Sequence, residues 1–93
     1  MRHLNLIGPQ VRKLRSQRGW TQEDLAGALQ RAGLDISRSG LAKVESRMIL
    51  VRDHHLHFFM KALRASLDDL YPPINTDDPN MYDVMNKLME SRF

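Results

Sequence analysis

The sequence predicts an all-α fold, and three observations support this. Apolar residues recur every three to four positions over most of the chain, as they do on the buried side of amphipathic helices. Residues that typically start helices precede several of these stretches, notably Thr21, Ser37 and Ser66. Prolines stand only at expected helix starts or just after expected helix ends, at positions 9, 72, 73 and 79.

The first two helices are expected on either side of Gly19. One runs from about Gly8 to Arg18, with Pro9 in its first turn, where the missing N–H costs nothing. Its inward residues are expected to be Ile7, Val11 and Leu14. The next starts at Thr21, which can accept a hydrogen bond from a first-turn amide while Asp24 completes a capping box. Its packing residues are expected to be Trp20, which can staple onto Leu25, together with Leu29 and Ala32.

A third helix is expected over residues 37–46, with Ser37 as its cap and Ile36 stapled onto Leu41. At about 100° per residue, one side of this helix is apolar and the opposite side is small and basic. The apolar side consists of Leu41, Val44 and Met48; the opposite side consists of Ser39, Ala42, Lys43 and Ser46, with Arg38 at the edge. Such a face can approach a DNA major groove. An ordinary solvated helix face has a similar composition, so these residues alone leave both interpretations open.

Two further helices and a terminal segment follow. The fourth helix starts near Asp53, and Ser66 with Asp69 forms a capping box for a last short turn. The apolar positions of the fourth helix are Leu56, Phe59, Met60 and Leu63. After Pro72 and Pro73, the segment 74–93 predicts one more helix with an apolar stripe of Met81, Val84, Met85, Leu88 and Met89. This stripe either folds back on the domain, pairs with a second copy, or binds a regulatory protein.

Most of the chain resembles a known family. The stretches IGPQVRKLRSQRGWTQEDLA, ISRSGLAKVE and VRDHHLHFFMKALRASLDDLY are similar to the phage-repressor-type helix-turn-helix family, also called the xenobiotic response element family. The resemblance covers roughly residues 7–71. It implies a compact, lambda-repressor-like bundle of about five helices. We therefore expect a DNA-binding domain at residues 1–73 and an extension at 74–93 for dimerisation or partner binding.

The resemblance also implies roles for individual residues. The expected base contacts are Arg38, Ser39 and Lys43, with Ser37 and Ala42 as lesser candidates. The expected phosphate contacts are Thr21, Gln22, Ser46 and Arg47, of which Gln22 also braces the reading helix. Arg15 and Glu45 are expected to form a structural ion pair that fixes the tilt of the reading helix.

The departures from the family pattern concern the region around the reading helix. About five more residues than usual separate Leu25-Ala26 from Ser37, so the second helix is longer or the turn is wider. Gly40 replaces a common Thr or Ser, and Arg47 replaces the usual Gly, which predicts strain if φ is positive there. The apolar run 48–51 replaces polar residues and favours a partner surface. The expected dimer or partner surface consists of Met48, Ile49, Leu50, Met81, Met85 and Leu88.

Composition limits the remaining function classes. Ninety-three residues without cysteine, signal peptide or membrane-length apolar stretch predict one soluble, cytoplasmic, nucleoid-associated domain. Residues 1–52 carry a net charge of +6 and residues 53–93 carry −3, so the half with the reading helix is basic. His54, His55 and His57 do not share a helix face, so we expect no metal site. We expect neither an enzyme nor a cofactor, because no catalytic arrangement is visible and a small bundle offers little pocket.

The sequence therefore predicts a transcriptional regulator that acts as a repressor. It would bind double-stranded DNA as a homodimer and lay the helix at 37–46 in each half of an inverted repeat. The alternative is a protein-protein interaction module of the same fold, such as an antitoxin or regulatory adaptor, working through the apolar loop and the terminal helix.

Overall fold

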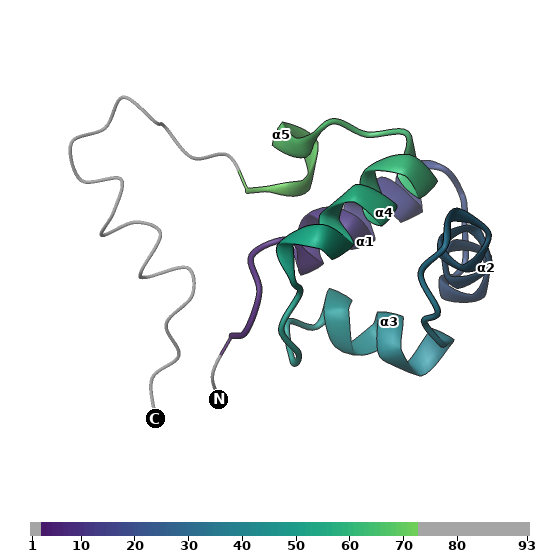
Figure 1. The fold of residues 1–93 in the computed structure, drawn as a ribbon. Helices are drawn as coiled ribbons and strands as arrows, with labels where there is room; N and C mark the ends of the chain where they lie inside the picture. The colour runs from purple at the N-terminus through teal and green to yellow at the C-terminus, as the bar shows by residue number, and fades with distance from the viewer. Residues whose placement is uncertain (1–2, 73–93) are drawn as a thin grey trace.

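The computed structural model describes residues 3–72 and confirms the all-α prediction for them (Figure 1). Within this range there are five helices and no strand: α1 (Gly8–Gln17), α2 (Gln22–Ala32), α3 (Arg38–Glu45), α4 (Asp53–Leu63) and α5 (Leu67–Leu70). The helix predicted in segment 74–93, with Met81, Met85 and Leu88, lies outside the described residues. None of the five described helices is long and apolar enough to span a membrane.

Local capping explains where several of these helices begin. Thr21 and Asp24 form a reciprocal capping box at α2, and Ser66 and Asp69 form another at α5, as predicted. Ser37 caps α3 by accepting a hydrogen bond from the Gly40 amide at 3.0 Å. Because Gly40 has no side chain, that box remains half formed. The α1 start differs, since its N-cap Ile7 makes no side-chain cap bond.

The core lies where α1, α2, α3 and α4 meet. α2 packs on α3 and α4, and α1 packs on α3, α4 and α5. The buried apolar side chains are Ile7, Val11, Leu25, Ala26, Leu29, Leu41, Val44, Phe59, Leu63 and Leu70. Ala32, which we expected to be buried, is only half-buried. Figure 1 shows α3 along the edge of the bundle, so that its outer side stays uncovered.

The connection between α2 and α3 is an ordered, extended link. α2 ends at Gly33, which has a left-handed backbone with φ of 116°. Leu34 and Ile36 then pack against the core, and the Gln30 side-chain amide donates to the Ile36 carbonyl at 2.7 Å. The additional residues of this chain therefore form a wide turn that the core and one side chain hold in place.

The apolar run after α3 is divided between the core and the surface. Ile49 and Val51 pack against the core of their own chain. Met48 is 49% exposed and Leu50 is 70% exposed. Met48 does not continue the apolar side of α3, because that helix ends at Glu45. Ile49 is thus largely withdrawn from the predicted partner surface, which is reduced in this loop to Met48 and Leu50.

Candidate nucleic-acid interface

The two sides of α3 have opposite environments. Leu41, Val44 and Glu45 are buried against the bundle, whereas Arg38, Ser39, Lys43 and Ser46 are exposed. Ala42 is half-buried between them. The structure therefore places the polar base-contact candidates, Ser37 among them, on exposed positions of one short helix and its cap. Such a helix can enter a major groove without losing its packing on the core.

The hydroxyl groups of α3 are mostly engaged within the helix itself. Ser37 Oγ accepts from the Gly40 amide and lies 3.0 Å from Ser39 Oγ. Ser46 Oγ donates to the Ala42 carbonyl at 2.7 Å. Arg38 and Lys43 are therefore the side chains of this face with the greatest reach and the only formal charge. Both are donors suited to the acceptor atoms of guanine.

Arg15 and Glu45 join α1 to the end of α3 by a two-pronged ion pair. Arg15 Nε donates to Glu45 Oε2 at 2.8 Å, and Arg15 Nη2 donates to Oε1 at 3.1 Å. The side chains are 13% and 4% exposed. The hydrogen bonds from Arg15 to Glu45, aided by the negative charge, raise the pKa of Arg15. Arg15 Nη1 also donates to the Trp20 carbonyl at 2.7 Å, which ties the α1–α2 turn to the pair.

Gln22 connects this buried pair to the exposed face. Its Nε2 donates to Glu45 Oε1 at 3.1 Å, and its Oε1 accepts from Arg38 Nη1 at 3.3 Å. An amide nitrogen has two N–H groups, so Gln22 can brace α3 with one and offer the other to a phosphate. Four side chains from three helices, Arg15, Glu45, Gln22 and Arg38, thus form one hydrogen-bonded network.

The segment before α1 holds the same C-terminal end of α3, a contact that the sequence did not predict. Buried Asn5 donates through Nδ2 to the carbonyls of Val44 at 3.1 Å and Ile49 at 2.9 Å. Its Oδ1 accepts from the Gly8 amide at 2.8 Å. The available sequence signal was an Asn just before a Gly-Pro helix start, where Asn often satisfies free amides. Its distant acceptors could not be read from the sequence.

Arg47 belongs to the same contact region, which we call the α3 clamp: Leu4, Asn5, Gly8 and Arg47. Arg47 has a positive φ of 64°, so the strain predicted for this position is present. Its Nε donates to the Asn5 carbonyl at 2.7 Å, and the Leu4 amide donates to the Arg47 carbonyl at 3.0 Å. Burial lowers the pKa of Arg47. These contacts give the side chain a structural role in holding the turn after α3.

A family comparison agrees with this geometry. A model of the helix-turn-helix domain matches residues 6–71, which include all five described helices. The chain belongs to the helix-turn-helix domain family. The comparison with curated proteins and the comparison with solved structures each found no match.

Within the helix-turn-helix domain, α2 and α3 are the two helices that give the family its name, and the network of Gln22 fixes one against the other. Membership implies that the chain binds DNA, and it confirms the resemblance to phage-repressor-type proteins. Domains of this family are typically non-enzymatic.

The histidines of the helix-turn-helix domain lie at the start of α4. The rings of His54 and His55 meet edge to face, with centroids 4.3 Å apart, while His57 packs on Phe58. Burial and the neighbouring positive charges lower the pKa of His55. Among residues 3–72, no group of three or more His, Cys, Asp or Glu is arranged to hold a metal ion.

Proposed function

We propose that this protein is a sequence-specific, double-stranded DNA-binding transcriptional regulator that acts as a repressor. The observation that carries the proposal is the outer face of α3, where Arg38, Ser39 and Lys43 are exposed while the inner face is fixed by Arg15, Glu45 and Gln22. A rigid helix with a small, basic outer face suits direct reading of base edges in the major groove.

The proposed contacts divide into reading and positioning. Arg38 and Lys43 donate to guanine O6 and N7, and Ser39 contacts a neighbouring base. Ser37 and Ala42 make lesser contacts with base edges in the major groove. Thr21, Gln22 and Ser46 position the domain on phosphates, aided by the positive end of α2. We assign Arg47 to the α3 clamp instead of a phosphate, because its Nε already donates to Asn5.

We further propose that two copies bind an inverted repeat. The support is the pair of exposed apolar side chains directly after α3, Met48 and Leu50, which a second copy would cover. A dimer contact beside the reading helix would set the separation of the two half-sites. In the usual geometry that separation is about 10 base pairs or one helical turn.

Selection of duplexes from a random library by the purified full chain, at roughly physiological salt, tests both proposals. We expect enrichment of an inverted repeat with guanine in each half-site. A second selection uses the Lys43→Ala variant, which we expect to enrich a motif altered at one or two positions. Recovery of no motif by the folded protein would overturn sequence-specific binding, and recovery of a single half-site would overturn the dimer.

A protein-interaction module of the same fold is the second candidate function. The exposed Met48 and Leu50 favour it, because apolar side chains in a loop also suit a partner protein. This function predicts that the folded parent chain enriches no DNA motif and that Leu50→Ser abolishes binding of the partner protein.

A further inference from the structure

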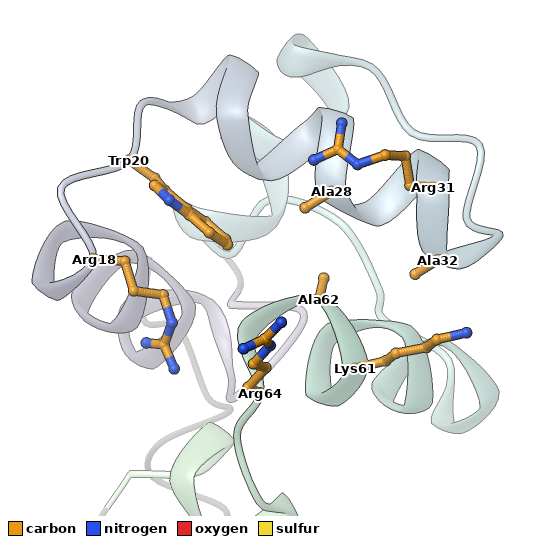
Figure 2. A pocket seen from close by; sticks show the side chains of 8 residues that line it. All are labelled: Arg18, Trp20, Ala28, Arg31, Ala32, Lys61, Ala62 and Arg64. Atoms are coloured by element: carbon orange, nitrogen blue, oxygen red, sulfur yellow. The ribbon is translucent and has the colours of Figure 1, made fainter.

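A pocket of about 640 Å³ lies between the end of α1, α2 and α4 (Figure 2). We call it the α2–α4 pocket. Its lining residues are Arg18, Trp20, Ala28, Arg31, Ala32, Lys61, Ala62 and Arg64. None of these lining residues belongs to α3, so the pocket is separate from the DNA-reading face. We expected little pocket in a bundle of this size, and this one is a hollow that lies open to the solvent.

Small side chains create the space. Ala28 and Ala32 from α2 and Ala62 from α4 line the pocket, and each adds only a methyl group. Figure 2 shows Trp20 pointing toward the same space as Ala28 and Ala62. The backbone of Trp20 is held on both sides, because its amide donates to the Arg15 carbonyl and its carbonyl accepts from Arg15 Nη1. The pocket thus has a flat aromatic wall in a fixed place, opposite a shallow apolar floor.

Four cations and no carboxylate line the α2–α4 pocket among the described residues. Arg18 is fixed at its edge, since Nη1 donates to the Leu14 carbonyl at 3.1 Å and Nη2 donates to the Leu63 carbonyl. Figure 2 shows Arg64 pointing inward, while Lys61 extends away along the rim. Glu23 and Asp24 line a neighbouring hollow that shares Trp20 and Arg31, and Arg18 acts electrostatically on Asp69. Within the pocket, the positive charge without a nearby carboxylate is therefore concentrated toward Arg64.

Arg64 provides an independent observation. It ends α4 with a left-handed backbone, φ 51° and ψ 48°, a conformation that L side chains rarely adopt. The same chain uses Gly33 to end α2, where the backbone is also left-handed. A cation thus stands at a helix end where glycine would be unstrained. Residues held in such conformations cluster at ligand-binding sites, where strain is tolerated for the sake of function.

We propose that the α2–α4 pocket binds a small anion that carries a planar ring. The ring lies between Trp20 and the alanine floor, and the phosphate or carboxylate group accepts hydrogen bonds from Arg64 and its neighbouring cations. The pocket volume falls in the range of small-molecule sites, about 300–1,000 Å³. A ligand bound there touches α1, α2 and α4 together and stabilises the folded domain.

Trp20 provides a direct readout, because it is the only tryptophan of the chain. The full-length protein is titrated with adenosine monophosphate as a phosphate probe and with benzoate as a carboxylate probe. Two control compounds are titrated in the same way: adenosine has the ring without the anionic group, and inorganic phosphate has the anionic group without the ring. We expect saturable quenching of tryptophan fluorescence by at least one of the two ring-bearing anions, and binding at least roughly tenfold weaker for adenosine and phosphate. Whichever of adenosine monophosphate and benzoate saturates at the lower concentration shows whether the pocket prefers a phosphate or a carboxylate.

Three variants locate the binding. Arg64→Gly removes the inward cation and also relieves the backbone strain, so we expect the variant to stay folded, and its thermal midpoint checks this. We expect it to weaken binding roughly five- to tenfold. Arg12→Asn removes an exposed cation of α1 outside the pocket, and Lys43→Ala removes one from the reading face; we expect less than about a twofold change for each.

Two outcomes would overturn the proposal. One is the absence of saturable quenching by both ring-bearing anions. The other is weakening by Lys43→Ala that equals or exceeds the weakening by Arg64→Gly, since the anion would then occupy the DNA-binding face. Neither outcome depends on DNA, so the selection experiment above and this titration can fail separately.

Discussion

Glu45 is the residue through which α3 is held at its buried side. It accepts from Arg15 on α1 and from Gln22 on α2, and its side chain is only 4% exposed. We expect Glu45→Gln to lower the free energy of unfolding by about 3 kcal/mol, because it leaves the Arg15 cation partly buried without a counter-charge. Urea unfolding measures this loss. The exposed Glu23→Gln is the matched control and should change stability by no more than about 0.5 kcal/mol. Equal losses for the two variants would contradict the prediction.

The two left-handed helix ends predict opposite effects of substitution. Arg64→Gly should raise the free energy of unfolding by about 1 kcal/mol, because glycine adopts φ of 51° without strain. Gly33→Ala should lower it by about 1–2 kcal/mol, since its Cβ would lie 3.1 Å from Phe58 Cε1 on a strained backbone. Thermal unfolding of both variants measures the two signs. A lower unfolding temperature for Arg64→Gly would contradict the prediction. It would show that the Arg64 side chain stabilises the fold by more than its backbone strain destabilises it.

At the scale of elements, the start of α1 lies very close to the end of α3. A Cβ on Gly8 would lie 2.3 Å from the Val44 carbonyl and 2.8 Å from the Glu45 carbonyl. Neither backbone atom can move aside alone, so Gly8→Ala should lower the free energy of unfolding by at least about 2 kcal/mol. Gly27→Ala is the control inside α2, where only a flexible Arg31 atom is near, and should be neutral or raise stability by up to about 1 kcal/mol. Urea unfolding ranks the two variants, and a Gly8→Ala protein as stable as Gly27→Ala would refute the close approach.

The capping box of α2 predicts an acid dependence of stability. Hydrogen bonds from the Thr21 backbone and side chain lower the pKa of Asp24 below 3.8. Because this pKa is lower in the folded state, the stabilisation is complete above the unfolded value and is lost as the pH falls through the folded value. We expect Asp24→Asn to unfold at a lower temperature than the parent chain at neutral pH. That difference should shrink as the pH falls below 3.8; a difference that stays constant across the range would argue against the carboxylate.

At the scale of the whole molecule, substitutions at exposed Lys43 and half-buried Gln22 should separate base reading from phosphate positioning. Lys43→Ala should weaken binding to the selected duplex by about 1–3 kcal/mol and relax its sequence preference, because a base contact is lost. Gln22→Ala should weaken binding to the selected and random duplexes by similar factors, because its phosphate contact is sequence-independent. Titrations of the selected and the random duplex at one salt concentration measure the ratio of the two affinities for each variant. The same ratio for both variants would disprove this division.

Local signals in the sequence were sufficient for the helices but not for their long-range contacts. Thr21 with Asp24 and Ser66 with Asp69 are three residues apart, so their capping boxes could be predicted from spacing. Asn5 binds the Val44 carbonyl 39 residues away, and no periodicity encodes such a contact. The family resemblance supplied the pairing of Arg15 with Glu45, which spacing alone could not.

The net charges of the two halves of the sequence did not predict where positive side chains gather in the fold. The basic half of the sequence suggested one positive side around α3. The structure instead brings Arg18 and Arg31 of that half together with Lys61 and Arg64 of the acidic half, around the α2–α4 pocket. Sequence position could not show this, because α2 and α4 become neighbours only in the fold.

The α3 clamp has a consequence for the motions of the domain. The bonds of Leu4 and Asn5 to the turn after α3 join two segments that are far apart in the chain. If residues 4–8 detach, Val44 and the turn after α3 lose these partners in the same event, so both segments should open as one cooperative unit. Amide hydrogens of Leu4, Gly8 and Arg47 would then exchange with solvent at a common rate. The rigidity of α3 therefore depends in part on a short segment near the start of the chain, 39 or more residues away from its acceptors.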